Sequence, residues 1–189
     1  MDPFILFQEW YSQELNLSHS EIPTACCLST IGIDGFPNAR FVSLKEILNG
    51  RFIVTGSLSS RKGKEIIANN KVALSFWWPN TLKQVRIQGI AGLISHKKAN
   101  YYFQSRDYYS KLVSSISKQG KANESIHELK NLFEIRKNEK LEIKCPNDWG
   151  GFSIKTQRIE FMKFNKTRFH ERVLYTNISN KWKVEHIEP

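Results

Sequence analysis

Short runs of strand-forming residues separated by turn dipeptides recur along most of this 189-residue chain, and they constrain its fold more than any other feature. Asp34-Gly35 and Asn49-Gly50 are dipeptides typical of tight β-hairpin turns. Around them the pattern predicts strands over residues 25–31, 38–45, 51–55, 72–78, 84–94, 151–154, 159–164, 173–176 and 182–187. Such a series of antiparallel strands favours a closed or partly open barrel, because closure removes exposed strand edges.

A helical pattern precedes the first predicted strand. Asp2 is a good N-cap, and Pro3 suits the first helical position, where its missing N–H is not needed. Apolar residues then follow at helical spacing, namely Phe4, Phe7, Tyr11 and Leu15. We therefore expect an N-terminal helix within residues 1–20.

A second helical region separates the first five predicted strands from the last ones. It covers residues 95–140, and within it Ser125 and Glu128 have the spacing of a capping box. We expect this region to be an insertion, after which residues 147–189 return as C-terminal strands that close the site. The whole chain is expected to be one domain of the α+β class, mainly β with helices.

The composition is that of a folded protein, with 40% hydrophobic and 24% charged residues, and this excludes disorder. No apolar run approaches the roughly 20 residues that cross a bilayer, and the N-terminus has no basic leader. Three cysteines, Cys26, Cys27 and Cys145, are too few for a disulfide framework and fit a reducing compartment. We expect a cytoplasmic protein with no membrane partner.

The formal net charge of +10 indicates an anionic partner, either a polyanion such as nucleic acid or small phosphorylated molecules. The basic residues are spread along the chain and form no block of like charges. The minor alternative is a nucleic-acid-binding protein that uses its positive charge together with aromatic residues such as Trp77 and Trp78. We expect phosphorylated small molecules and no nucleic acid.

Residues 59–64 (SSRKGK) form the densest chemical signal, at the start of a predicted helix that ends at Asn69-Asn70. Hydroxyl groups, cations and free backbone N–H groups at the positive end of a helix suit a phosphate group. The alternative is a solvent-exposed helix start. Basic residues in a first helical turn are, however, electrostatically unfavourable unless an anion is present.

The predicted strand over residues 38–45 carries two cations. Simple alternation places Arg40 and Lys45 on opposite faces, unless a bulge intervenes. They can make two separate anionic contacts, or they can be surface charges at the ends of a strand. Gln84, at the start of a later strand, can address a polar ring edge or face solvent.

The last cluster, residues 168–172 (RFHER), stands directly before a predicted strand. Alternation would place Arg168, His170 and Arg172 on one side, which joins an imidazole to two fixed cations. The neighbouring positive charges would keep the imidazole neutral and suit an anionic or electron-rich substrate. A histidine with a purely structural role is the alternative.

Seven short blocks are spread along the chain, at residues 40–45 (RFVSLK), 60–63 (SRKG), 84–89 (QVRIQG), 102–106 (YFQSR), 117–119 (SKQ), 149–152 (WGGF) and 168–172 (RFHER). They occur in the order in which the pyridoxamine 5'-phosphate oxidase family has them, so the chain from about residue 23 onward resembles that family. Seven ordered blocks are far more specific than any one of them.

The resemblance implies an antiparallel FMN-binding split β-barrel that works as a homodimer, with FMN at the interface and no metal. By position, it implies cofactor contacts at Arg40, Ser43, Lys45, Val54, Thr55, Arg61, Lys62, Gln84, Gln119, Gly120, Met162 and Arg172. It implies substrate contacts at Lys45, Tyr102, Arg106, Ser110, Arg168 and His170, of which Arg168 and His170 are the catalytic pair over the substrate ring.

The implied activity is oxidation of pyridoxamine or pyridoxine 5'-phosphate to pyridoxal 5'-phosphate. A hydride passes from the substrate C4' to the flavin N5, and O2 then reoxidises the flavin and yields hydrogen peroxide. The redox chemistry belongs to the flavin. Arg168 and His170 would therefore act by positioning and electrostatics, and not by covalent catalysis.

Three departures from the family pattern predict a lower cofactor affinity. Met162 replaces a Trp that usually contacts the flavin, Gly120 replaces a Ser, and the loop from Thr55 to Arg61 is one residue longer. A methionine can still pack against an aromatic ring, so we expect the site to persist. By the same resemblance, we expect the chain to begin close to the barrel, without the basic N-terminal segment that helps to cover the substrate in relatives.

Two other functions remain open from the sequence. The first is a related FMN oxidase that acts on another small ring compound, of the type found in phenazine pathways. Lys45, Tyr102, Arg106 and Ser110 argue against it, because they match the family's grip on a substrate phosphate. The second is a flavin-binding carrier or sensor without turnover, and the presence of Arg168 and His170 argues against that.

Overall fold

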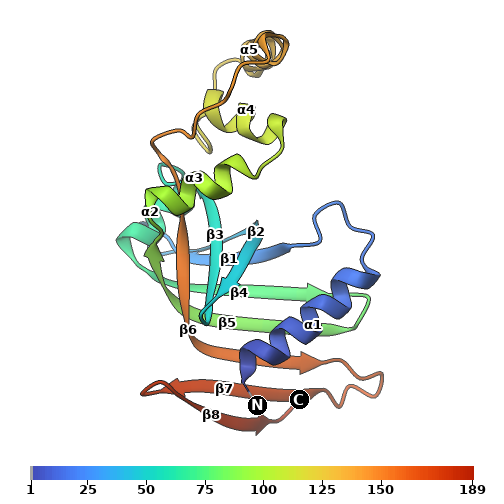
Figure 1. Ribbon diagram of the computed structural model, residues 1–189. Coiled ribbons are helices and arrows are strands. Elements are labelled where there is room, and N and C mark those ends of the chain that lie inside the picture. Colours follow the sequence, from blue (N-terminus) through green and yellow to red (C-terminus); the bar gives the residue numbers. More distant parts are fainter. Residues whose placement is uncertain (1) are drawn as a thin grey trace.

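The eight strands form one antiparallel sheet whose first six members close into a barrel (Figure 1). The computed structural model describes residues 2–189. Its strands are β1 (Ala25–Ile31), β2 (Pro37–Leu48), β3 (Arg51–Ser57), β4 (Lys71–Trp78), β5 (Lys83–Leu93), β6 (Trp149–Lys163), β7 (Glu171–Ile178) and β8 (Lys181–Ile187). The strand order is β3-β2-β1-β4-β5-β6-β7-β8, and an additional β3–β6 pairing closes the barrel. The expected antiparallel split barrel of the α+β class is confirmed.

Strand β6 is the longest strand, and its pairing with β3 closes the barrel. Its first half pairs with β3 and its second half with β7, while β5 runs beside both halves. The prediction of two separate strands, 151–154 and 159–164, was wrong. The polar residues between them stay in the strand, and Gln157 is accommodated as a bulge opposite the Gln88–Gly89 step.

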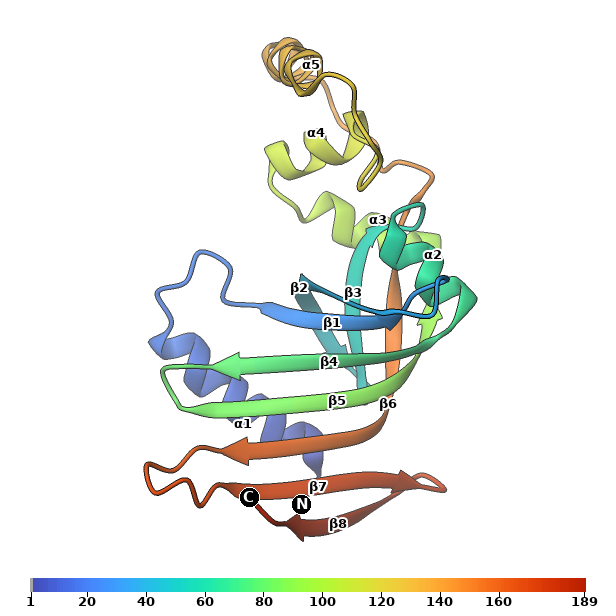
Figure 2. The ribbon, with the colours of Figure 1, turned by 180° about the vertical axis from the view of Figure 1, so that it is seen from behind.

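Five helices accompany the barrel: α1 (Pro3–Leu17), α2 (Arg61–Ala68), α3 (His96–Gln104), α4 (Tyr108–Ile116) and α5 (Ile126–Glu139). Their N-caps include Asp2 and Ser125, as predicted, and also Ser60, and the Ser125 hydroxyl accepts the Glu128 N–H at 3.2 Å. Helices α3, α4 and α5 form a lobe that extends away from the barrel, whereas α1 lies against the barrel wall (Figures 1 and 2). None of the helices in residues 2–189 has the length and hydropathy to cross a membrane.

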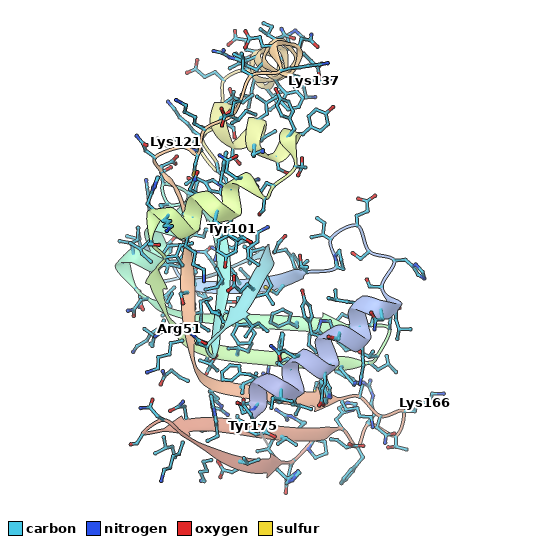
Figure 3. All side chains as sticks on the ribbon, in the orientation of Figure 1. Arg51, Tyr101, Lys121, Lys137, Lys166 and Tyr175 are labelled. Carbon is cyan, nitrogen blue, oxygen red and sulfur yellow. The ribbon has the colours of Figure 1, made fainter. Side chains whose placement is uncertain are left out.

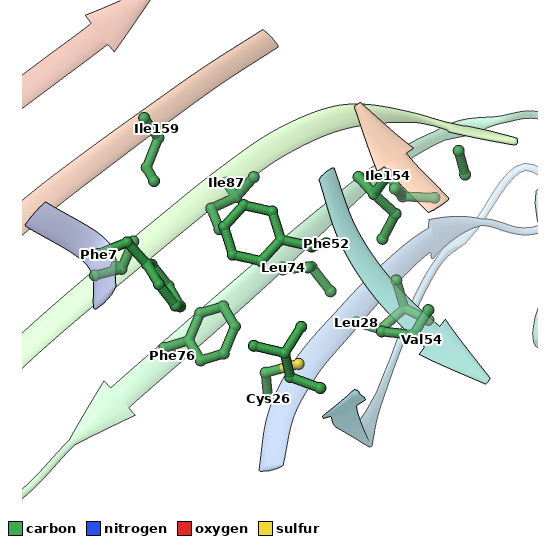
Figure 4. Packing of buried hydrophobic residues seen from close by; sticks show 14 of the residues in the cluster. Phe7, Cys26, Leu28, Phe52, Val54, Leu74, Phe76, Ile87, Ile154 and Ile159 are labelled. Carbon is green, nitrogen blue, oxygen red and sulfur yellow. The ribbon is translucent and has the colours of Figure 1, made fainter. Parts of the chain in front are cut away.

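The main hydrophobic core fills the barrel and includes α1. The fully buried Phe7 ring makes edge-on contacts with Phe52 and Phe76, with centroids 4.9 and 5.0 Å away (Figure 4). It makes a third such contact with Trp78, at 5.4 Å. Such aromatic pairs stabilise beyond the effect of buried area alone. The first helix is therefore held by strands that are distant from it in the sequence.

A smaller cluster joins the helical lobe to the barrel. It contains Ile53 of β3, Ala99, Tyr102 and Phe103 of α3, and Trp149 of β6. The Phe103 and Trp149 rings meet edge-on at 5.2 Å. This contact fixes the end of α3 above the place where β3 and β6 pair, and so it positions the residues that follow α3.

Candidate functional site

A cavity of 460 Å³ lies between strands β2 and β3, the start of α2 and the helical lobe. Its size is in the usual range for cofactor and substrate sites. Seven of the residues that the sequence predicted for the site line it, namely Arg40, Ser43, Lys45, Thr55, Lys62, Arg106 and Gln119. The structure therefore brings together cations from β2, α2 and the segment after α3.

Arg40 and Lys45 line the same cavity, and so do residues on both faces of β2 between them: Val42 on the face of Arg40, and Phe41 and Ser43 on the other. Leu44 pairs with Val54 and Glu46 pairs with Ile53, so Lys45 is the extra residue between the two pairs. Simple alternation predicts opposite faces for the two cations, and the cavity receives both because it is lined from both faces of this strand.

Lys62 enters the cavity from the first turn of α2. The turn is fixed by Ser60, whose hydroxyl accepts the Gly63 N–H at 3.4 Å and the Lys62 Nζ donor at 3.1 Å. Nζ also donates to Oε1 of Gln119 at 2.8 Å. Burial, and then the positive charge of Arg40, lower the pKa of Lys62. A side chain at Gly56 would crowd this lysine, since its Cβ would lie 3.1 Å from Lys62 Cε.

Arg106 enters from the other side, just after α3. Its guanidinium lies over the rings of Trp149 and Phe103, at 5.4 and 5.7 Å, and Nη1 donates to the Ser114 hydroxyl at 2.7 Å. Burial lowers the pKa of Lys45, and the charge of Arg106 lowers it further. The two cations are thus neighbours whose mutual repulsion an anion would relieve.

The cavity carries an excess of positive charge. Within residues 2–189, no carboxylate lies within 4.0 Å of the charged nitrogens of Lys45, Lys62 or Arg106. Arg40 is neutralised by Glu65, at 2.9 Å. The acidic residue among the described lining, Asp148, accepts the hydroxyls of Ser57 and Ser59 at 2.8 and 2.6 Å. Three uncompensated cations in one cavity suit a phosphorylated ligand.

Arg61 points away from this cavity, although the sequence grouped it with Lys62. Its Nη2 donates to Asp34 and its Nε to Glu65, both at 2.8 Å, and it borders a separate hollow. Successive residues of a helix diverge by about 100°, so the two neighbours face different surroundings. The anions that balance Arg61 are therefore side chains of the protein itself, whereas Lys62 in the same turn has none among the described residues.

Gln84, Met162 and Arg172 lie side by side on the outer face of the barrel. Gln84 pairs with Met162 across β5 and β6, and Met162 pairs with Arg172 across β6 and β7. Their neighbours Val85 and Phe161 point into the core. None of the three lines the 460 Å³ cavity in the part of the chain that the structure describes.

Arg168 and His170 belong to the loop before β7. The expected alternation from residue 168 to 172 was wrong, because Arg168 has a left-handed φ of 69° and the strand begins only at Glu171. Nδ1 of His170 accepts the Asn165 N–H at 3.1 Å. In Figure 3, Lys166 of this loop lies far from Lys121 of the helical lobe. His170 and Arg172 line their own hollow of 440 Å³.

The remaining predicted residues lie beside the cavity without lining it. The Tyr102 hydroxyl donates to Glu46, and burial followed by this hydrogen bond raises the pKa of Tyr102. The N–H of Ser110 donates to the Asp107 cap of α4 at 2.9 Å, Val54 is buried, and Gly120 follows Gln119 with a φ of 78°.

Sequence reasoning missed Ser114, Asp148 and Glu65. Ser114 meets Arg106 of the segment before α4, and Asp148 and Glu65 meet partners that are distant in the chain, so none of the three is marked by a local pattern.

Comparison with known proteins covers nearly the whole chain. Residues 20–138 match the family model described as pyridoxamine 5'-phosphate oxidase, and residues 149–189 match that of the pyridoxine 5'-phosphate oxidase C-terminal dimerisation region. Pyridoxine/pyridoxamine 5'-phosphate oxidases of Nostoc punctiforme and Christiangramia forsetii are 35% and 36% identical over 192 residues. In both cases the match covers 100% of this chain and 89% of the relative.

Solved structures share the fold. PhzG from Burkholderia lata, crystallised with tetrahydrophenazine-1-carboxylic acid, superposes with a TM-score of 0.93 at 22% identity, over 100% of this chain and 93% of that one. A pyridoxamine 5'-phosphate oxidase-related, FMN-binding protein from Nostoc punctiforme gives a TM-score of 0.82 at 17% identity, over 100% and 98%. Together with the sequence matches along both parts of the barrel, these findings place the chain in the pyridoxamine 5'-phosphate oxidase family.

Proposed function

We propose that the protein is an FMN-dependent oxidase that converts pyridoxamine or pyridoxine 5'-phosphate to pyridoxal 5'-phosphate, with O2 as electron acceptor. Family membership supports an oxidoreductase. The observation that carries the proposal is the cavity that Lys45, Lys62 and Arg106 face, with no carboxylate of residues 2–189 within 4.0 Å of their charged nitrogens. One phosphorylated cofactor and one phosphorylated substrate would supply the missing negative charge.

The residues of the cavity fit FMN. Lys62 and Gln119 are joined beside Gly56, where the absence of a side chain leaves room around the lysine. We assign the cofactor phosphate to Lys62, with Arg40, Ser43, Thr55 and Gln119 as further contacts and Val54 and Gly120 beside them. Arg61 would join them only by leaving Asp34 and Glu65. FMN, when bound, supplies the acceptor for the substrate hydride and the site at which O2 is reduced.

A homodimer would complete the site. Gln84, Met162 and Arg172 lie on the outer face, whereas the cationic cavity opens between the barrel and the helical lobe. Residues 149–189 match a dimerisation region, and this segment includes Met162 and Arg172. We propose that the partner protomer places this outer face over the cavity, so that two copies of the chain share each FMN.

The substrate would be held by its phosphate and its ring. Lys45 and Arg106 take the phosphate, with Tyr102 and Ser110 beside them. Arg168 and His170 would come from the loop before β7 of the partner protomer, lie over the pyridine ring and orient its C4' carbon. Because Nδ1 of His170 accepts a backbone N–H, its ring proton resides on Nε2, and this makes Nε2 a donor toward the substrate.

A spectroscopic experiment tests the proposal. The purified protein should be a yellow dimer, and anaerobic addition of pyridoxamine 5'-phosphate should bleach the flavin absorbance. Pyridoxamine without its phosphate should bleach it far more slowly at the same concentration. A protein that binds no FMN would refute the assignment. Bleaching by a reduced phenazine carboxylic acid but not by pyridoxamine 5'-phosphate would identify an oxidase for another ring compound, and FMN that no such substrate reduces would indicate a carrier.

A further inference from the structure

Glu160 is a buried carboxylate on the outer face of the barrel, outside the cationic cavity. It is 4% exposed, while its neighbours Ile159 and Phe161 point into the core. Two arginines cover it. Oε1 accepts Nη2 and Nε of Arg172 at 2.8 and 3.1 Å, and Oε2 accepts Nη2 of Arg86 at 2.5 Å.

The sheet register makes this arrangement possible. Arg86 of β5 is directly opposite Glu160 of β6, and Arg172 of β7 is opposite Met162, one outward-facing position further along. A carboxylate removed from water is costly unless it is paired and hydrogen-bonded, and here each oxygen has a guanidinium partner. Burial alone would raise the pKa of Glu160, but the hydrogen bonds and charges of both arginines lower it.

The consequence falls on Arg172. Two of its five N–H groups are committed to one oxygen of Glu160, and Nη1 donates to the carbonyl oxygen of Glu188 at 3.0 Å. The planar guanidinium is therefore held at two edges, which fixes its orientation before any ligand arrives. Arg86, with its side chain 51% exposed, is held only through Nη2 in the described contacts.

We infer that Glu160 is a positioning residue for the cofactor: it presets the Arg172 guanidinium in the orientation that meets FMN across the dimer interface. The inference rests on the proposed function, in which Arg172 contacts the flavin. Glu160 itself touches neither cofactor nor substrate in this scheme. Because Glu160 already orders the Arg172 side chain, less side-chain entropy is lost when FMN binds.

A double-mutant cycle on FMN affinity tests the inference. The dissociation constant for FMN is measured by titrating the FMN-free protein and following the quenching of flavin fluorescence. The titration is done for the wild type, Glu160→Gln, Arg172→Leu and the double variant. We expect Glu160→Gln to raise the constant about tenfold in the wild-type background and to have no further effect when Arg172 is already Leu. Glu185→Gln is the matched control. Leu174 of β7 lies between Glu160 of β6 and Glu185 of β8 in the sheet, so the two carboxylates are on the same face, but Glu185 forms its ion pair with the exposed Lys183.

The possible outcomes distinguish the positioning role of Glu160 from the proposed function on which it rests. If Arg172→Leu weakens FMN binding and Glu160→Gln does not, or if Glu160→Gln acts equally in both backgrounds, the positioning role is refuted while the proposed function stands. If Arg172→Leu has no effect, the contact between Arg172 and FMN fails, and the positioning role fails with it. Should Glu160→Gln not fold, Glu160→Asp, which keeps the charge and shortens the reach, enters the same cycle.

Discussion

Nζ of Lys62 lies 2.8 Å from Oε1 of Gln119, and this hydrogen bond joins the first turn of α2 to the loop after α4. The contact spans 57 positions in the chain. It brings a cation to the wall of the cavity on which the proposed cofactor site depends. The consequences of this geometry can be measured one residue at a time.

Lys62→Met should weaken FMN binding by about tenfold or more, because a charge-assisted hydrogen bond to phosphate is lost. Arg61→Met should cost less, since Arg61 is engaged by Asp34 and Glu65. Titration of the FMN-free variants by fluorescence measures both. Lys64→Met, an exposed change in the same helix, is the control. Equal losses for all three variants would show that general charge, and not Lys62, binds the cofactor.

Lys45→Met and Arg106→Leu should each raise the KM for pyridoxamine 5'-phosphate about tenfold or more, while turnover of unphosphorylated pyridoxamine changes little. The physical reason is that both cations face the same anionic ligand. Steady-state oxidase assays with the two substrates measure the difference. Lys97→Met, on the exposed side of α3, should leave both KM values unchanged. A parallel rise for both substrates would contradict the role in phosphate recognition.

Arg168→Leu and His170→Asn should leave the spectrum of bound FMN nearly intact and lower oxidation of pyridoxamine 5'-phosphate. The expected fall is about tenfold for each 1.4 kcal/mol of transition-state positioning that is lost. Leu has the same steric cost as Arg at the left-handed φ of residue 168, so the change removes the charge without relieving the backbone. Lys166→Met serves as the control in the same loop. Wild-type turnover in both test variants would remove the support for this substrate.

Gly63→Ala should destabilise the fold, whereas Gly92→Ala should be tolerated. A Cβ on Gly63 would lie 2.2 Å from the carbonyl oxygen of Leu58, while a Cβ on Gly92 meets no atom within 4 Å. Forcing a methyl group into packed structure costs about 1 to 3 kcal/mol, and a clash with backbone leaves little room to relax. Urea unfolding of the two variants measures the difference. Equal midpoints would show that the loop before α2 can move aside.

Glu65→Gln should make the free energy of unfolding depend less on pH at acidic pH. Burial raises the pKa of Glu65, but hydrogen bonds from Thr30, Arg61 and Arg40 outweigh burial and bring it below the usual 4.5. A carboxyl with a lowered folded-state pKa stabilises the protein above its unfolded pKa, and that stability is lost as the pH falls through the folded value. The wild type should therefore lose more free energy of unfolding than Glu65→Gln between about pH 4.5 and the lower folded-state pKa. Urea titrations at several pH values test this, and parallel curves would contradict it.

The sequence by itself determined most elements, because their boundaries depend on local chemistry. Asp2, Ser60 and Ser125 cap helices with their own side chains, and the Asn49-Gly50 turn separates β2 from β3. The ordered motif blocks indicated the family, which the comparisons confirm.

Only the tertiary structure decided where the charged side chains point. The cavity is lined from both faces of β2, so that it receives Lys45 as well as Arg40, and ion pairs with Asp34 and Glu65 draw Arg61 away from Lys62. A left-handed residue at position 168 breaks the alternation on which the grouping of Arg168 with Arg172 depended. Alternation and helical spacing describe regular segments, whereas bulges, loops and long-range ion pairs are set by the elements that pack around them. The barrel could thus be predicted from the local sequence pattern. The division of the predicted site residues between a cavity and an outer face could not.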